Sequence, residues 1–307
     1  MTFVERLQSL WSGYGELWRA ELSENGKTTS VVVKHVQPPH ENASRSHQRK
    51  LRSYDVERAF YERYAARCLD SPGCPVPRPR LLQKADSGWL FVLEDLDASG
   101  FSERSSHATA PQISATLRWL AAFHARFLGT APDGLWKIGS YWHLATRPDE
   151  LRAMRHPALR EAASRIDARL NGARFKTLVH GDAKLENVCF TRAGEAERGV
   201  CLVDFQYVGG GVGVKDVAYL LNGCLSARDC ESAVPKYLDE YFHELRVALT
   251  ANGASDAEHV EREWRALFPF AWVDFYRFLL GWASGSFDRD PYSERLTKDV
   301  LSTLTSG

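Results

Sequence analysis

The sequence lacks an excess of either charge, a closely spaced cysteine pair and a long uninterrupted apolar run. Lysine plus arginine and aspartate plus glutamate each total 39, so the formal charge is zero. Without a basic excess we expect no nucleic-acid partner and no attraction to an anionic membrane. None of the six cysteines forms a C-x-x-C pair, which disfavours a zinc site or a disulfide framework. Buried free thiols in a reducing, cytoplasmic compartment are the simpler interpretation.

The apolar segments are too short or too interrupted to cross a membrane. Residues 267–283 are the most apolar stretch, but Asp274 and Arg277 lie inside it and it is shorter than a spanning helix. Charged residues such as Glu5 and Glu16 interrupt the N-terminal stretch, which is not typical of a signal peptide. The sequence therefore predicts no membrane insertion and a buried helix near the C-terminus.

The first third of the chain is rich in strand signals. We expect a hairpin sheet from residue 10 to about 36, because the β-branched "TTSVVVKHV" follows "ELWRAEL" across an Asn-Gly turn. The polar, proline-interrupted residues 37–50 predict a loop, and a helix is expected from about 54 to 68. An extended linker at 73–83 then leads into a strand, "WLFVLEDL".

The remainder of the chain is mainly helical in pattern. Thr109 and Pro111 are a helix start signal, with apolar residues at helical spacing up to a stop at Gly129. Helical patterns continue at 148–170 and from Asp216 to the end, with a polar hairpin, "TRAGEAERG", between two short apolar strands. The pattern predicts an α+β protein with a small antiparallel-sheet N-lobe, residues 1–97, and a larger, mainly helical C-lobe, residues 98–307.

Polar side chains follow two short apolar runs in the C-lobe. The first stretch is "LVHGDAKLENVCF", with Asp182 and Asn187 five positions apart, and the second is "CLVDFQ", with Asp204. Three oxygen-bearing side chains at strand ends suit a hard cation such as Mg²⁺, which completes its shell with phosphate and water oxygens. This combination indicates phosphoryl transfer, in which the protein mainly positions the reactants and neutralises charge.

"HGDAKLEN" followed by "LVDFQ" resembles the catalytic and metal-binding loops of the protein-kinase-like small-molecule phosphotransferases. These are the aminoglycoside phosphotransferase, choline kinase and ecdysteroid-kinase-like group, and the metal loop of the last also tends to be D-F-Q. The resemblance implies the bilobal protein-kinase-like fold, with ATP and Mg²⁺ as cofactors. It implies that Asp182 is the catalytic base, that Asn187 and Asp204 are Mg²⁺ ligands, and that His180 is a buried support for the loop. A capping or turn network is the alternative role for Asp182 and Asn187.

The N-lobe offers a lysine and two competing glutamates. Lys34 ends the run "VVVK", and the resemblance implies that it contacts the ATP phosphates, with a glutamate of the next helix as its partner. Glu57 borders the apolar face that carries Tyr61, whereas Glu62 groups with Arg58 on a solvated face. Helical spacing therefore selects Glu57.

Two further N-lobe segments resemble nucleotide-binding parts of the same family. "GYGELW" resembles its reduced glycine-rich turn, in which Gly13 and Gly15 would let backbone amides approach the phosphates. An ordinary hairpin turn is an equal alternative. "FVLEDL" resembles the segment joining the lobes, and the resemblance implies that the backbone from Glu94 to Leu96 hydrogen-bonds adenine.

Lys184 departs from the small-molecule families and resembles the protein-kinase lysine that contacts the transferred phosphate. A protein-kinase interpretation therefore stays open, although the glycine-rich segment after Asp204 is too short for a regulated activation segment. Asp216 resembles the structural aspartate of the family, and we expect it to cap the N-terminus of its helix.

The C-terminal helix carries aromatic residues around an aspartate. In related enzymes the C-lobe helices shape the acceptor pocket, and aromatics with carboxylates suit a cationic or amphipathic alcohol; an aromatic stripe that only packs in the core is the alternative. The residues are Trp272, Asp274, Phe275, Tyr276 and Trp282, with Asp288 and Asp290 beyond.

The combined prediction is an ATP- and Mg²⁺-dependent kinase that phosphorylates a hydroxyl of a small molecule. The acceptor is an amino alcohol, an aminoglycoside, or a sugar-like or lipid-like alcohol. A catalytically silent nucleotide-binding pseudoenzyme of the same fold is the alternative of a different class. The use of GTP in place of ATP and the oligomeric state both stay open. A P-loop is excluded, because the sequence has no Gly-Lys-Ser/Thr.

Overall fold

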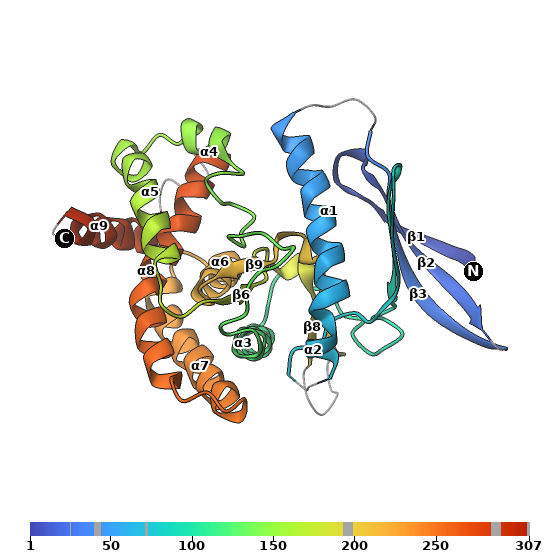
Figure 1. Cartoon of the computed structure of the whole chain (residues 1–307). Helices are drawn as coiled ribbons and strands as arrows, with labels where there is room; N and C mark the ends of the chain where they lie inside the picture. Colours follow the sequence, from blue (N-terminus) through green and yellow to red (C-terminus); the bar gives the residue numbers. More distant parts are fainter. Residues whose placement is uncertain (25, 40–43, 71–72, 193–198, 284–289, 306–307) are drawn as a thin grey trace.

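The computed structural model describes residues 1–24, 26–39, 44–70, 73–192, 199–283 and 290–305. Figure 1 shows a twisted sheet at the N-terminal side, a cluster of helices at the C-terminal side, and the long helix α1 between them. The predicted bilobal arrangement of a small sheet lobe and a larger helical lobe is confirmed. The lobe boundary at residues 97–98 stays a prediction; it falls in the loop between β5 and α3.

The N-lobe sheet is antiparallel throughout, in the order β1-β2-β3-β5-β4. Its strands are β1 (Thr2–Ser9), β2 (Gly15–Glu24), β3 (Lys27–Val36), β4 (Pro79–Ala85) and β5 (Gly88–Glu94). The valine-rich β3 occupies the centre, where it pairs with β2 on one edge and with β5 on the other, as its β-branched run favours. Lys34 of this strand pairs with Glu57 of α1.

Helix α1 (Arg45–Arg63) packs its apolar face against the sheet and continues after Tyr64 into the short α2 (Ala65–Leu69). Val36 and Phe91 from the sheet share one core with Tyr54 and Phe60 from α1. The backbone amide of His47 donates to the Ser44 side chain at 3.2 Å, which caps the helix. This packing fixes the face of α1 that carries Glu57.

Three N-lobe predictions are wrong in their boundaries. The sheet begins with β1 at Thr2 and not at residue 10, because this edge strand is almost fully exposed and has no apolar alternation. Helix α1 begins at Arg45 and not at 54, because its first turns are polar and carry no apolar periodicity. The predicted linker at 73–83 includes the start of β4, which pairs with β5 beyond a register shift at Pro79.

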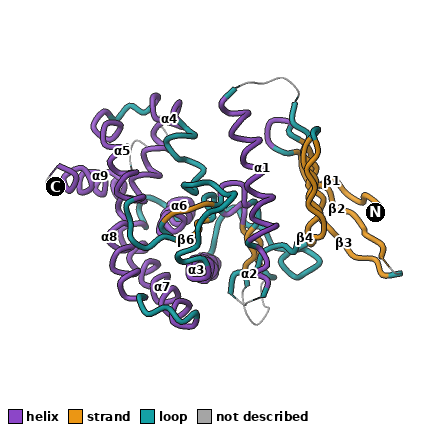
Figure 2. The backbone as a smooth tube through the Cα atoms, in the orientation of Figure 1, coloured by secondary structure: helices purple, strands orange, loops and turns teal. Residues whose placement is uncertain are grey.

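The C-lobe is built from helices that surround two small two-stranded sheets (Figure 2). The helices are α3 (Ala110–Arg126), α4 (Pro148–Ala153), α5 (Pro157–Asn171), α6 (Val214–Cys224), α7 (Cys230–Ala251), α8 (Ala257–Trp282) and α9 (Pro291–Thr305). The strands are β6 (Thr177–Val179), β7 (Val188–Phe190), β8 (Val200–Leu202) and β9 (Gly209–Gly211), with β6 paired to β9 and β7 to β8. The predicted helix start at Thr109 is confirmed by a capping box with Gln112.

The short strands place the two polar loops. Residues 180–187 connect β6 to β7, and residues 203–208 connect β8 to β9. Most of the predicted "TRAGEAERG" hairpin lies outside the described residues, but β7 and β8 pair on either side of it. In the described part of the chain, no helix combines the length and the apolar composition that crossing a bilayer requires.

Candidate active site

Lys34 of β3 lies between the two lobes. Its ammonium donates to Glu57 Oε2 at 2.7 Å and to Oε1 at 3.0 Å, and it lies 3.4 Å from Oδ1 of Asp204 in the C-lobe. The structure therefore contains the pairing that helical spacing selected, while Glu62 pairs with Arg58 on the surface. Although burial opposes it, the charges of Glu57 and Asp204 raise the pKa of Lys34, so its ammonium stays charged.

Gln206, directly after Asp204 and Phe205, holds the metal loop to α1. The Ser53 hydroxyl donates to Gln206 Oε1 at 3.0 Å, and the Gln206 side chain also hydrogen-bonds to Glu57. The Phe205 ring stacks on Phe60 with centroids 3.9 Å apart. Sequence reasoning missed this role of Gln206, although the D-F-Q string was its signal.

The Asp182 carboxylate is buried and receives donors on both oxygens. The Tyr219 hydroxyl donates to Oδ1 at 3.0 Å, and Nδ2 of Asn187 donates to Oδ2 at 3.1 Å. The Lys184 ammonium lies 3.6 Å from Oδ2. Burial raises the pKa of Asp182, and the nearby charge of Lys184 opposes this rise. The group is thus a fixed carboxylate with increased basicity.

The backbone of the catalytic loop is held by Asp216. Its carboxylate accepts the amides of His180 at 2.6 Å and Gly181 at 2.9 Å, and it pairs with His124 Nε2 at 3.1 Å. The prediction that Asp216 caps its helix is wrong, because Gly213 is the N-cap and Asp216 lies inside the first turn. From there its buried carboxylate accepts hydrogen bonds from the loop amides and does not cap its own helix.

His180 is fully buried and joins the two loops, as expected of a support. Its Nε2 bonds to the Val203 carbonyl at 3.0 Å, and its Nδ1 to the Asp182 amide at 3.3 Å. The Val203 carbonyl is an acceptor and the Asp182 amide is a donor. A neutral ring with its proton on Nε2 satisfies both partners. The ring therefore needs no charge to hold Asp182 beside the residue that precedes Asp204.

Asn187 and Asp204 present the oxygens that could hold a cation. Nδ2 of Asn187 is used in bonds to the carbonyl and carboxylate of Asp182, which leaves Oδ1 as the remaining polar atom. Asp204 adopts a left-handed backbone at φ 65°, and its side chain is 35% exposed. A carboxylate and a carboxamide oxygen are the hard donors that Mg²⁺ prefers.

The glycine-rich turn lies at the start of β2. Gly13 and Gly15 both have positive φ, and a Cβ on Gly15 would lie 2.0 Å from the His35 carbonyl oxygen, so only glycine fits there. Tyr14 between them points inward and bonds to His47 Nδ1 at 2.6 Å. The turn is therefore anchored on α1 by its tyrosine.

The segment after β5 runs along the C-lobe side of the cleft. The Glu94 amide donates to the Arg78 carbonyl at 2.9 Å, and the Leu96 carbonyl accepts the Phe101 amide at 2.8 Å. Within the described part of the chain, the Leu96 amide donates to no backbone carbonyl. The Leu96 side chain packs against Cys189 and Cys201 of β7 and β8, next to the two polar loops.

The aromatic residues of α8 mostly pack in the core, as the alternative held. Trp272 and Tyr276 are buried, and Trp282 alone of the predicted aromatics is exposed, at 60%. Asp274 is 1% exposed and accepts from Arg277 Nε at 3.0 Å and from Trp142 Nε1 at 2.8 Å, so it is not available to an acceptor.

Of the other predicted acceptor residues, Phe275 reaches the site because its ring lies 4.5 Å from that of Tyr219. Asp290 caps α9 by accepting the amides of Tyr292 and Ser293. Asp288 lies outside the described residues. Tyr219 was not predicted, because its contact with Asp182 spans 37 positions and leaves no local spacing signal.

The fold and the two loops define a small-molecule phosphotransferase of protein-kinase-like fold. The profile of the Phosphotransferase enzyme family matches residues 18–254, and the chain belongs to that family. No curated protein sequence matches the chain significantly.

Solved structures support the fold. An amicoumacin kinase in complex with AMP-PNP, Ca²⁺ and Ami is 15% identical, with a TM-score of 0.58 over 98% of this chain and 88% of that one. A microcompartment-associated aminopropanol kinase is 14% identical, with a TM-score of 0.52 over 98% and 90%. An ethanolamine kinase of Plasmodium vivax is 14% identical, with a TM-score of 0.50 over 94% and 80%. At these identities the likeness is one of fold.

Proposed function

We propose that this phosphotransferase moves the γ-phosphoryl group of ATP to a hydroxyl of a small molecule, with Mg²⁺ as cofactor. The observation that carries the proposal is the contact of Lys34 with Glu57 and Asp204, which joins a buried N-lobe ammonium to the C-lobe loop that carries one of the two hard oxygen donors. This is the arrangement that phosphoryl transfer requires, since it neutralises phosphate charge beside a positioned base.

The nucleotide would lie between the glycine-rich turn and the two loops. Lys34 supplies a charged ammonium for the phosphates, and the positive φ of Gly13 and Gly15 lets the turn approach them closely. The Leu96 amide and the Glu94 carbonyl lie in the segment joining the lobes and would bind adenine through hydrogen bonds. Measuring turnover with GTP in place of ATP tests whether the site accepts a guanine base instead of adenine.

The donor set at the end of the loops fits a divalent cation. Asn187 Oδ1 and the Asp204 carboxylate would hold it, because the other Asn187 atom is committed to Asp182. When bound, Mg²⁺ would neutralise the negative charge on the phosphate oxygens.

Asp182 acts as the base in this proposal. It orients the acceptor hydroxyl and takes its proton while the hydroxyl oxygen bonds to the γ-phosphorus and the bond to the β–γ bridging oxygen breaks, which releases ADP. Tyr219 and Asn187 fix the carboxylate from two sides. Lys184, 3.6 Å from Asp182 Oδ2, supplies positive charge for the transferred phosphoryl group.

Aminopropanol and ethanolamine kinases occur among the proteins of similar fold. A small hydroxyl compound is therefore the acceptor class that we propose here. All six cysteines are free thiols and five are buried, which suits the reducing cytoplasm, where ATP is also supplied.

The test is ADP release by the purified protein with ATP, Mg²⁺ and a panel of hydroxyl compounds. We expect acceptor-dependent release that Asp182→Asn lowers by about 10²–10⁴-fold while ATP binding persists. Asp239→Asn, which removes a carboxylate from a surface pair with Arg265, is the matched control. ATP binding without turnover in the wild type would favour a pseudoenzyme, and full turnover in Asp182→Asn would exclude Asp182 as the base.

A further inference from the structure

Three cations converge where the start of α1 meets the segment before α4. Arg49 and Lys50 lie in the first turns of α1, and Arg147 directly precedes α4. An NH1 group of Arg49 donates to the Thr146 carbonyl at 2.8 Å, which joins α1 to the residue beside Arg147. Figure 1 shows the N-terminal end of α1 and α4 on the same side of the molecule. The two lobes thus bring together charges that are about a hundred residues apart in sequence.

The cluster is connected to the loop that carries Asp182. The Arg147 guanidinium stacks 4.0 Å from the Tyr141 ring centroid, and its Nε donates to the Tyr141 carbonyl at 3.1 Å. The Tyr141 amide in turn donates to the Gly181 carbonyl at 2.8 Å, directly beside Asp182. One aromatic residue therefore separates Arg147 from the base.

Lys50 adds a charge without a paired carboxylate. Its ammonium lies 4.3 Å over the Tyr14 ring of the glycine-rich turn, and among the described residues no carboxylate lies within ion-pair distance of it. Burial, together with the charges of Arg49 and Arg147, lowers the pKa of Lys50. Mutual repulsion of the three groups is thus part of the unliganded state.

The cluster is only partly neutralised within the described residues. Glu150 approaches Arg147 at 3.3 Å. Arg49 has neutral partners, the Thr146 carbonyl and the Ser46 hydroxyl, and its buried Nε has no acceptor in the described part of the chain. Excess positive charge in a partly desolvated position is unfavourable unless an anion compensates it.

Asp274, the carboxylate expected to attract a cationic acceptor, is already bound by other residues of the protein. Asp274 is buried and bound to Arg277 and Trp142. A competing carboxylate is Glu186, which is exposed two residues after Lys184. A cationic acceptor would use Glu186, and an anionic acceptor would use the three cations.

We propose that Arg49, Lys50 and Arg147 bind an oxyanion group of the acceptor, so that the enzyme phosphorylates hydroxy acids and similar anionic alcohols. This inference rests on the proposed function. Guanidinium groups suit it because they bind carboxylates through paired hydrogen bonds, and Lys50 adds a point charge. The acceptor spans from Asp182 along Tyr141 to Arg147.

The first experiment compares matched acceptors by ADP release at saturating ATP and Mg²⁺. Each set shares one carbon skeleton: glycerate, glycerol and serinol form one set, and glucuronate, glucose and glucosamine form the other. We expect the acid to have the highest kcat/KM of its set, by about tenfold over the neutral alcohol. A higher kcat/KM for the amine, or equal values for acid and neutral alcohol, overturns the inference and leaves the kinase activity standing.

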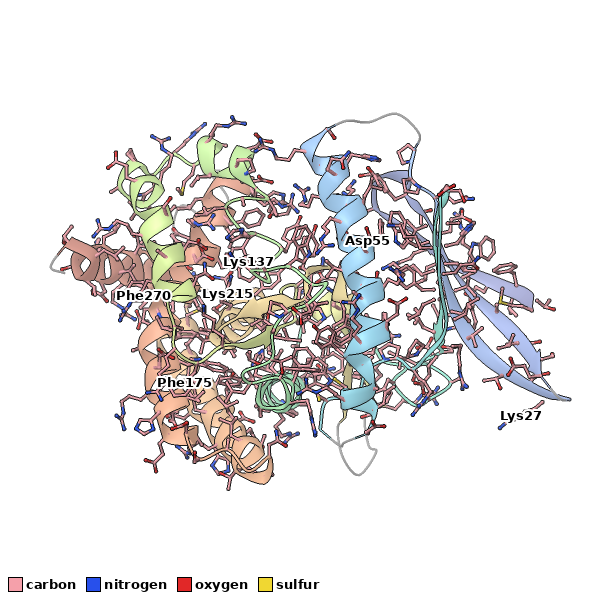
Figure 3. All side chains as sticks on the ribbon, viewed as in Figure 1. Lys27, Asp55, Lys137, Phe175, Lys215 and Phe270 are labelled. Atoms are coloured by element: carbon pink, nitrogen blue, oxygen red, sulfur yellow. The ribbon has the colours of Figure 1, made fainter. Side chains whose placement is uncertain are left out.

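The second experiment removes single charges. Lys50→Gln should raise the KM for the acid about three- to tenfold with little change in the KM for ATP. Lys27→Gln is the matched control, because Lys27 lies at the tip of the β2–β3 hairpin, far from the C-lobe (Figure 3). A rise confined to the KM for ATP assigns Lys50 to the nucleotide phosphates and overturns the inference. The inference is also overturned if Glu186→Gln raises the KM for the preferred acceptor and Lys50→Gln does not.

A binding measurement separates failure of the inference from failure of the proposed function. Should no compound be turned over, the proposed function fails, and glycerate and glucuronate are titrated by calorimetry into protein with AMP-PNP and Mg²⁺. Binding that weakens in Lys50→Gln but not in Lys27→Gln supports the anion site. Absence of binding by both acids, or equal binding by both variants, overturns it.

Discussion

The Tyr219 hydroxyl donates a hydrogen bond of 3.0 Å to Oδ1 of Asp182. Its ring is held between Trp142, at 5.0 Å, and Phe275, at 4.5 Å, so the aromatic core of the C-lobe fixes the hydroxyl. Burial and the charge of Asp182 raise the pKa of Tyr219 well above its ordinary value, which keeps it a proton donor. The orientation of the Asp182 carboxylate is therefore set by α6 and α8, and not by its own loop alone.

Removing this hydroxyl tests whether Tyr219 positions the base. We expect Tyr219→Phe to lower kcat by about tenfold with an unchanged KM for ATP. The hydrogen bond lowers the pKa of Asp182, so its loss should move the acidic limb of the pH–kcat/KM profile to higher pH. Tyr237→Phe, on the partly buried face of α7, is the control. A lower kcat with an unmoved profile would indicate that Tyr219 only packs.

The two glutamates of α1 allow a matched comparison of ion pairs. Glu57→Gln leaves the buried Lys34 ammonium without its main counter-charge, and we expect a loss of about 3 kcal/mol in the free energy of unfolding. Glu62→Gln breaks an exposed pair with Arg58 and should cost less than about 0.5 kcal/mol. Urea denaturation measures both. Equal losses in the free energy of unfolding would contradict a larger contribution of the buried Lys34–Glu57 pair. The KM for ATP should rise in Glu57→Gln and not in Glu62→Gln.

Asp216 should stabilise the protein in a pH-dependent way. His124 and the loop amides lower its pKa despite burial, so its contribution is present above its ordinary value of 3.8 and is lost as pH falls through the lower folded-state value. Asp216→Ala leaves buried donors unpaired and should cost about 3 kcal/mol at pH 7. Denaturation at neutral and acid pH checks this, and a gap that grows on acidification would contradict it. Asp229→Ala, at the exposed start of α7, serves as control.

Local patterns were enough to predict the parts of the site that lie close in sequence or on one helix face. The spacing of Asp182, Asn187 and Asp204 identified both loops, and helical periodicity selected Glu57 over Glu62. The start signal of Thr109 and Pro111 located the beginning of α3 to within one residue. These features are encoded within a few positions, where propensity and spacing act.

The rest of the site depends on contacts that local patterns do not encode. Tyr219 contacts Asp182 across 37 positions, and Trp142 contacts Asp274 across 132. The contact with Trp142 occupies Asp274, which is the carboxylate that the sequence analysis predicted for the acceptor pocket. Arg147 is linked to the loop that carries Asp182 only through Tyr141, whose amide donates to the Gly181 carbonyl. Strand β1 was missed for a different reason, since an exposed edge strand has no apolar alternation to detect.

The buried Asp182 carboxylate should lower the stability of the folded protein. Burial raises its pKa above the ordinary value of 3.8, so between these two pKa values the folded state binds more protons than the unfolded chain and stability falls as pH rises. Asp182→Asn avoids this loss: the new amide accepts from Asn187 and donates to the oxygen of Tyr219. We therefore expect Asp182→Asn to be more stable than the wild type at pH 7, by about 0.5–2 kcal/mol.

The pH dependence distinguishes this cause from a change in packing. The gap between Asp182→Asn and the wild type should close as pH falls toward 3.8, where the unfolded-state carboxylate also begins to protonate. Denaturant midpoints measured from neutral to acid pH show this, with Asp239→Asn on the surface of α7 as the control. A variant less stable than the wild type at pH 7 would mean that the carboxylate's hydrogen bonds outweigh its desolvation. A gap that is constant with pH would assign the gain to packing, and not to the charge that the reaction needs.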